Sequence, residues 1–106
     1  MKMNQIDTEY NLLKILKDNP EITQRQLSKE LGLSLGKTNY VLHELIDKGF
    51  MKLSNFKRSD NKVGYLYLLT TKGIEEKSIL AKNFLERKSA EYYKLKNEIE
   101  ILKSEL

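Results

Sequence analysis

The chain has 106 residues, of which 40% are hydrophobic and 32% charged, and this length fits a single small folding unit. It has no cysteine, which excludes disulfides, thiolate nucleophiles and cysteine-ligated metals, and no apolar run approaches the roughly 20 residues that cross a bilayer. The amino-terminal residues also lack an apolar signal core, so the sequence predicts a soluble, cytoplasmic protein with no membrane partner.

The formal net charge of +4 is unevenly distributed along the chain. Residues 1–33 and residues 73–106 each balance to zero, whereas residues 34–72 carry seven positive and three negative side chains. Because a local patch attracts a polyanion more strongly than the average charge does, the middle third is the candidate segment for facing a nucleic acid. A solvated face with a few extra lysines is the alternative.

The first two helices are indicated by apolar spacing and by end signals. Apolar side chains at helical intervals predict a helix over residues 7–18, which the following Asn-Pro pair ends. Thr23 predicts the start of a second helix, because Gln26 three residues later completes a capping box. Gly32 provides a left-handed end for that helix.

Ser34 is the predicted cap of a third helix that runs to about Lys48 and ends at Gly49. Two short helices joined by a glycine-containing turn match the helix-turn-helix pattern. At 100° per residue, one face of the third helix is expected to meet the core. The expected core residues are Leu35, Thr38, Leu42, Leu45 and Ile46. The expected solvent face carries Gly36, Lys37, Tyr40, His43, Glu44 and Asp47, with Asn39 at its edge.

Two aromatic and aliphatic segments, residues 50–56 and 63–69, are predicted strands, and the residues between them are polar and basic. A hairpin that directly follows a helix-turn-helix is a wing. Tyr65 and Tyr67 share one face of the second strand. They form either a stacking platform for single-stranded nucleic acid or a part of the core, and core packing is the favoured interpretation.

A long final helix is predicted from Thr71 onward, because this segment has no proline and a single glycine. Thr70 or Thr71 is its expected cap, and its length is some 34 residues, about 50 Å. A heptad repeat over residues 81–106 gives an apolar seam. The seam residues are Ala81, Leu85, Lys88, Tyr92, Leu95, Ile99, Leu102 and Leu106.

The charges beside this seam favour a parallel homodimer. In a parallel two-stranded coiled coil, Glu91 faces Lys96 of the other chain and Glu98 faces Lys103. An antiparallel pairing sets like charges opposite each other. The alternative is that the same stripe folds back on the first helix of its own chain.

No constellation of residues indicates catalysis. The stretch 32–38 differs from a phosphate-binding loop, since three residues separate its glycines where that motif needs four. His43 is the only histidine and does not by itself build a zinc site, and no nucleophile, base and acid stand in a recognisable order. The sequence predicts a protein that is not an enzyme and needs no cofactor, with His43 on a helix surface that touches phosphate or a base.

Four motifs occur in a set order: a T-x-x-Q helix start, a G-L-S turn, the helix exit LIDKGFMK and, after the wing, LTTKG. In this order they resemble the MarR family of winged-helix transcription regulators over residues 7–77, and most of all its small subgroup associated with exopolysaccharide gene clusters. The resemblance implies a dimeric DNA-binding protein whose third helix enters the major groove while the wing touches the minor groove or the backbone.

The resemblance also implies roles for particular residues. Typical members wrap further helices around an effector pocket, and here a single terminal helix replaces them, so a small-molecule effector is left open. The wing keeps part of the family's Asp-x-Arg-x-Arg-like tip, which leaves minor-groove insertion by Arg58 open as well. The base-contacting positions fall on Gly36, Lys37, Asn39 and Tyr40. The phosphate-holding positions fall on Thr23, Gln24, Arg25 and Ser34, and the wing-tip positions on Lys57, Arg58 and Lys62.

The sequence thus predicts a mainly α fold with one small β-hairpin. Residues 1–72 are the expected winged helix-turn-helix DNA-binding domain, and residues 73–106 the expected dimerisation helix. The expected function is sequence-specific binding of double-stranded DNA by a homodimer on an inverted-repeat operator, to regulate transcription. Two alternatives stand beside it: a winged-helix module that binds another protein, and a double-stranded RNA-binding module.

Overall fold

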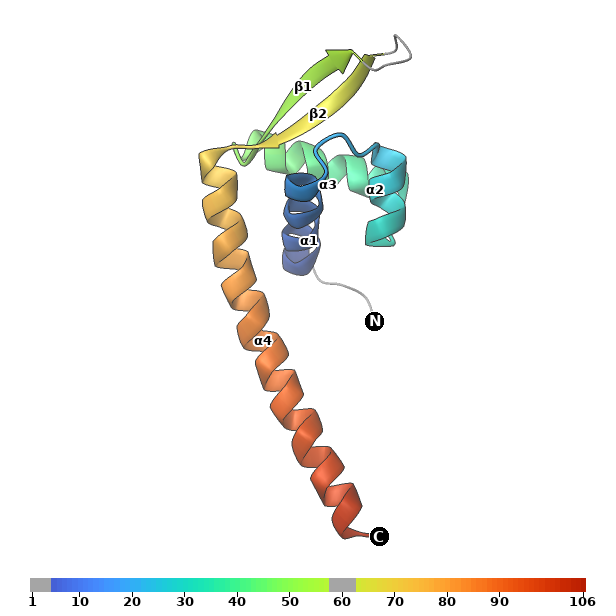
Figure 1. Ribbon diagram of the computed structural model, residues 1–106, viewed down its shortest axis with the longest axis vertical. Coiled ribbons are helices and arrows are strands. Elements are labelled where there is room, and N and C mark those ends of the chain that lie inside the picture. Colours follow the sequence, from blue (N-terminus) through green and yellow to red (C-terminus); the bar gives the residue numbers. More distant parts are fainter. Residues whose placement is uncertain (1–4, 58–62) are drawn as a thin grey trace.

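The structure, a computed structural model, describes residues 5–57 and 63–106. Three short helices lie together at one end, the hairpin lies beside them, and one long helix extends away from the group (Figure 1). The predicted fold, mainly α with a small hairpin and a long terminal helix, is confirmed. The elements are α1 (Gln5–Asp18), α2 (Gln24–Leu31), α3 (Leu35–Asp47), β1 (Met51–Lys57), β2 (Val63–Leu69) and α4 (Thr71–Ser104).

The helix ends follow from side-chain capping. The Thr23 hydroxyl oxygen accepts the backbone N–H of Gln26 at 3.1 Å, and the Gln26 side-chain oxygen accepts the N–H of Thr23, also at 3.1 Å. Gly32 ends α2 in the left-handed region at a φ of 67°, which glycine adopts without steric cost. Ser34 then caps α3 by accepting the N–H of Lys37 at 3.1 Å. The predicted caps of α2 and α3 are therefore confirmed.

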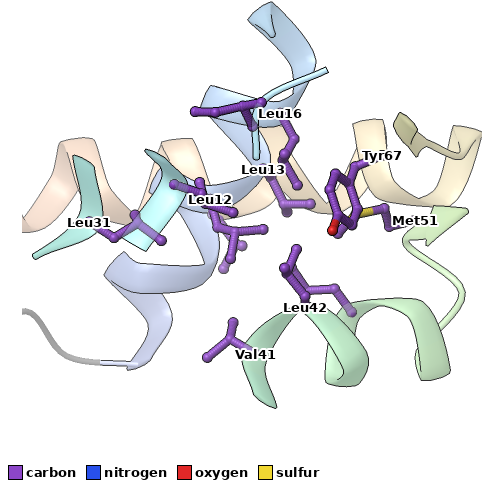
Figure 2. Close-up of a cluster of buried hydrophobic side chains, with 12 residues drawn as sticks. Leu12, Leu13, Leu16, Leu31, Val41, Leu42, Met51 and Tyr67 are labelled. Atoms are coloured by element: carbon purple, nitrogen blue, oxygen red, sulfur yellow. The ribbon is translucent and has the colours of Figure 1, made fainter. Parts of the chain in front are cut away.

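The core lies between α1, α2, α3 and the base of the hairpin, and Figure 2 shows its central side chains. Tyr67 from β2 points into this cluster beside Met51 from β1. The buried apolar residues are Leu12, Leu13, Leu16, Ile22, Leu27, Leu31, Val41, Leu42, Leu45, Met51, Tyr67 and Leu80.

The expected core face of α3 is wrong at two positions. Leu35 was expected in the core but is 47% exposed, whereas Val41, which was not expected there, is fully buried. Leu35 occupies the first turn of α3, whereas the buried stripe of this helix consists of Thr38, Val41, Leu42 and Leu45, whose apolar members belong to the shared core. The exposed face of α3 therefore includes Leu35 and is rotated relative to the face expected from the sequence.

The two strands of the hairpin pair antiparallel, with Leu53 opposite Tyr67 and Asn55 opposite Tyr65. The backbone N–H of Tyr67 also donates to the carbonyl of Pro20 at 3.0 Å, so the segment after α1 borders the sheet on its other side. Tyr67 is 3% exposed and Tyr65 is 55% exposed. The favoured interpretation, core packing, therefore holds for Tyr67, and the pair does not form a stacking platform.

A single residue joins β2 to α4. The hydroxyl oxygen of Thr70 accepts the N–H of Gly73 at 3.0 Å, and the N–H of Thr70 donates to the carbonyl of Phe50 at 3.1 Å. Gly73 packs directly on that same segment: a methyl group added there would lie 2.9 Å from the carbonyl carbon of Phe50 and closer still to its oxygen. Only glycine allows α4 to start this close to the end of α3.

The helix α4 packs on its own domain only along its first half. Leu80 is buried in the core, the Phe84 ring lies 5.3 Å from the ring of Tyr10, and Arg87 forms a two-contact ion pair with Asp7. From residue 91 onward every residue is exposed. The radius of gyration is 17.9 Å, against about 13 Å for a compact chain of this length. The difference reflects the protruding half of α4 (Figure 1).

Candidate nucleic-acid interface

The helices α2 and α3 are fixed to each other by a buried polar contact. The Ser28 hydroxyl lies 2.9 Å from the Thr38 hydroxyl, and Thr38, which is fully buried, donates to the carbonyl of Ser34 at 2.9 Å. Buried hydroxyl groups that are fully paired hold one geometry, because any displacement leaves a costly unpaired group. The helix-turn-helix is therefore a rigid unit.

The outer face of α3 presents polar side chains and bare backbone to solvent. Lys37, Tyr40 and His43 are exposed, as the sequence predicts. A methyl group added to Gly36 would meet nothing within 4 Å, so at this point the backbone itself is open to a partner. We refer to Gly36, Lys37, Tyr40 and His43 as the reading face.

Two neighbours hold Tyr40 in place on the reading face. The Lys37 ammonium lies 5.2 Å from the centre of the Tyr40 ring, within the range of a cation–π contact. The Glu44 carboxylate is hydrogen-bonded to the Tyr40 hydroxyl, which raises the pKa of that phenol. Tyr40 therefore remains a neutral hydrogen-bonding group at physiological pH. The i, i+4 spacing of Tyr40 and Glu44 was the available signal for this pairing, although the sequence interpretation gave Glu44 no role.

Asn39 lies at the edge of the reading face and is half-buried. Its side-chain N–H donates to the side-chain oxygen of Gln24 on α2 at 3.3 Å. The side-chain N–H of Gln24 in turn donates to the Tyr67 hydroxyl on β2, also at 3.3 Å. Asn39 and Gln24, expected separately as a base contact and a phosphate contact, are thus linked, and Tyr67 was not expected at this site.

The amino-terminal ends of α2 and α3 carry the remaining predicted contacts of the helix-turn-helix. Thr23 and Ser34 are the exposed caps of the two helices, and Arg25 is exposed in the first turn of α2. The first N–H groups of a helix have no partner within it, and they sit at the positive end of the helix dipole. Such an end offers N–H donors to a phosphate.

The predicted contacts of the wing fall largely beyond what the structure describes. Arg58 and Lys62 lie outside the described residues, and Lys57 is described only as the last residue of β1. The two strands, β1 and β2, extend away from the carboxyl-terminal end of α3 (Figure 1).

The predicted dimerisation residues lie along α4 and are mostly exposed in the single chain. Ala81 is half-buried beside the core, and Lys88 is exposed and ion-paired to Glu91 at 3.2 Å. The first half of the helix packs on α1, as the intramolecular alternative expects, and residues 91–106 are exposed, so pairing between chains stays a prediction for that half. The exposed apolar seam residues are Leu85, Tyr92, Leu95, Ile99, Leu102 and Leu106.

Within residues 5–57 and 63–106, no three side chains of the metal-binding types gather closely enough to hold an ion. Among the helices described, none is both long and apolar enough to cross a membrane.

The family model "Winged helix-turn-helix DNA-binding" matches residues 7–50, which comprise most of α1 together with α2 and α3. No curated protein matches the chain.

Several solved structures have the same fold. A PadR-like transcriptional regulator from Bacillus cereus superposes with a TM-score of 0.74 at 18% identity, covering 82% of this chain and 89% of that one. ZitR, a zinc-responsive MarR family member from Lactococcus lactis, was solved in complex with DNA and superposes with a TM-score of 0.64 at 20% identity. This match covers 92% of the chain and 63% of ZitR. The adhesin competence repressor AdcR from Streptococcus pyogenes superposes with a TM-score of 0.67 at 21% sequence identity, and the match covers 91% of this chain and 68% of AdcR.

The chain therefore spans about two thirds of the MarR-like structures and most of the PadR-like one. The likeness to MarR regulators inferred from the motifs is confirmed at the level of the fold, whereas the exopolysaccharide subgroup remains a prediction. Residues 7–50 match a family of DNA-binding domains, and the described part of the chain has the winged helix-turn-helix fold seen in MarR-family and PadR-like transcriptional regulators, with one long helix after the hairpin.

Proposed function

We propose that the protein is a transcriptional regulator that binds double-stranded DNA sequence-specifically. In this proposal it acts in the cytoplasm, has no catalytic activity, and binds as a homodimer to an inverted-repeat operator. The helix α3 enters the major groove, and the hairpin touches the minor groove or the backbone. The observation that carries the proposal is the reading face, which stands exposed on a helix that is rigidly held by α2.

The reading face offers chemistry that suits base edges. Lys37 donates to the O6 and N7 atoms of guanine, and Asn39 pairs with the N6 and N7 atoms of adenine. Tyr40 contacts a thymine methyl group or a phosphate, and Gly36 lets the backbone approach closely. His43 adds a further contact to a phosphate or a base. The solved complexes of ZitR with DNA support this use of the fold.

Phosphate contacts supply the affinity that does not depend on sequence. The ends of α2 and α3 at Thr23 and Ser34 offer N–H donors, and Arg25 and the wing lysines offer charge. Cations that neutralise phosphates release condensed counterions, so binding weakens as the salt concentration rises. The excess of positive charge in residues 34–72 fits this role.

The second half of α4 is the proposed dimerisation element. Its apolar seam is exposed in the single chain, and the glutamates and lysines that flank it match a parallel coiled coil. Two copies related by a two-fold axis present two reading faces. The operator is then an inverted repeat with half-sites about 10 bp apart, or a multiple of that distance.

DNA binding is tested on a duplex selected from a random pool and on random duplex. Lys37→Ala and Asn39→Ala should each cost about 1–3 kcal/mol on the selected duplex and relax the preference at one base pair. Lys57→Ala should weaken binding to all duplexes alike and lower the salt slope by about one. Lys94→Ala, which removes an exposed charge from the protruding half of α4, is the control and should change neither the base preference nor the salt slope.

The outcome also separates the remaining functions. Equal losses on selected and random duplex for Lys37→Ala, Asn39→Ala and Lys57→Ala would contradict the assigned roles. Absence of binding to any duplex at low salt would favour a module that binds another protein, and preference for an A-form RNA duplex would favour RNA.

Dimerisation is tested with two substitutions of matched exposure on α4. Ile99 is on the heptad seam and 43% exposed in the single chain, whereas Ile101 is off the seam and 50% exposed. Ile99→Asp should therefore convert the dimer to a monomer in sedimentation equilibrium, and Ile101→Asp should leave it a dimer. Equal effects of the two changes, or a wild-type monomer at high micromolar concentration, would refute the proposed seam.

A further inference from the structure

Three polar side chains from three different elements form one hydrogen-bonded chain behind the reading face. Asn39 on α3 donates to Gln24 on α2 at 3.3 Å, and Gln24 donates to the Tyr67 hydroxyl on β2 at 3.3 Å. The three residues are 15 and 43 positions apart in sequence. Strand β2 is therefore linked through Gln24 to Asn39, which is a predicted base contact.

Tyr67 is the fixed end of this chain. Its ring lies among the buried leucines of the core, where the residue is 3% exposed (Figure 2). Its backbone N–H is also held by the carbonyl of Pro20 at 3.0 Å. Asn39 and Gln24, by contrast, are only half-buried and lie on surface helices. The core therefore fixes the position of the Tyr67 hydroxyl oxygen, with which the Gln24 amide forms its hydrogen bond.

The direction of the hydrogen bonds determines what Asn39 presents outward. Because Tyr67 accepts from the Gln24 nitrogen, the Gln24 oxygen turns toward Asn39, and one N–H of Asn39 turns inward to meet it. Within residues 5–57 and 63–106, this leaves the carbonyl oxygen and the second N–H of the Asn39 side chain available. One acceptor beside one donor matches the N6 and N7 edge of adenine in the major groove.

We propose that Tyr67 is a positioning residue for base recognition: through Gln24 it orients the Asn39 amide so that α3 selects adenine at one base pair of each half-site. This inference rests on the proposed DNA-binding function. An amide whose orientation is already set loses less conformational entropy when it binds, and it disfavours bases that need the opposite orientation.

The test uses two tyrosines of the same strand. Tyr67→Phe keeps the buried ring and removes the hydroxyl, and Tyr65→Phe removes a hydroxyl from an exposed ring. The measured quantity is the ratio of affinities for two duplexes that differ only at the base pair read by Asn39, the pair whose preference is lost in Asn39→Ala. Tyr67→Phe should lower this ratio about three- to tenfold, the worth of one net hydrogen bond, while Tyr65→Phe leaves it unchanged.

Two further variants keep the inference falsifiable. Gln24→Ala, which removes the middle of the chain from a surface helix, should lower the same ratio even if Tyr67→Phe destabilises the fold. In an Asn39→Ala background, Tyr67→Phe should have no further effect on the ratio, since the oriented group is gone.

The possible outcomes distinguish this inference from the proposed function. A wild-type protein that ignores duplex DNA refutes the function itself. A wild-type protein with sequence preference, together with an unchanged ratio in Tyr67→Phe or Gln24→Ala, refutes only the positioning role. An equal loss on both duplexes in Tyr67→Phe would mark Tyr67 as a structural residue and overturn the inference.

Discussion

The contact between Gly73 and Phe50 makes a sharp prediction about stability. A methyl group on Gly73 would lie 2.9 Å from the Phe50 carbonyl carbon and nearer to its oxygen, well inside ordinary van der Waals separation. The Phe50 backbone is held in place by hydrogen bonds and does not shift easily. The Phe50 carbonyl accepts the N–H of Thr70 at 3.1 Å, and the Phe50 N–H donates to Leu45 at 3.0 Å. Gly73→Ala must therefore shift either the start of α4 or the exit of α3.

The size of the effect follows from two opposing contributions. Overpacking a tight contact costs about 1–3 kcal/mol, and a backbone neighbour places this site at the upper end. Alanine in a helix recovers about 0.5–1 kcal/mol relative to glycine. The net expectation for Gly73→Ala is a loss of about 2 kcal/mol, which lowers the melting temperature by roughly 8 °C or more in a domain of this size.

Gly36 provides the matched control, since it is also helical but has open space around it. Gly36→Ala should gain up to about 1 kcal/mol of stability. Urea denaturation followed by circular dichroism measures both variants, at one protein concentration because the proposed dimerisation would add to the apparent stability. The reasoning fails if Gly73→Ala is as stable as the wild type, or gains stability as Gly36→Ala does.

Three other changes have defined outcomes. Thr38→Val, which keeps the shape but removes the buried hydroxyl, should cost about 1–2 kcal/mol in urea denaturation, and a neutral result would contradict the locking of α2 to α3. The Arg87 hydrogen bond holds the pKa of Asp7 below its usual value of 3.8, so this stabilisation is complete above that pH and is lost as the pH falls below it. Asp7→Asn should thus lower the melting temperature at pH 7 but lose its effect near pH 2; a difference that persists in acid would exclude the ion pair as its cause. Lys96→Glu should weaken the dimer in sedimentation, and adding Glu91→Lys should restore it if the helices are parallel.

The sequence was most informative where a signal is local. The ends of α2 and the start of α3 depend on Thr23, Gln26, Gly32 and Ser34, each of which acts within three or four residues. The length of α4 follows equally from the absence of helix breakers after Gly73. Such features are determined by residues close together in the sequence, so they were predicted correctly.

The sequence was less informative where distant segments meet. Whether Leu35 or Val41 faces the core depends on how α3 is placed against the other elements, which periodicity alone does not determine. The tight contact at Gly73 involves the Phe50 backbone, and the Tyr67 hydroxyl is hydrogen-bonded to Gln24, 43 residues away in sequence. These contacts depend on tertiary packing, which is why Tyr67 was not expected at the candidate site.

The join between the hairpin and α4 has a consequence for the operator of the proposed dimer. Thr70 alone separates β2 from α4, the first half of α4 is packed on α1, and α4 is one continuous helix, so no linker joins the described part of the hairpin to the protruding half of α4. Inserting one base pair between half-sites rotates one of them by about 34° around the duplex. A dimer without a hinge does not swivel to follow that rotation. The DNA would have to absorb it by twisting or bending, so we expect the proposed dimer to accept only a narrow range of spacer lengths.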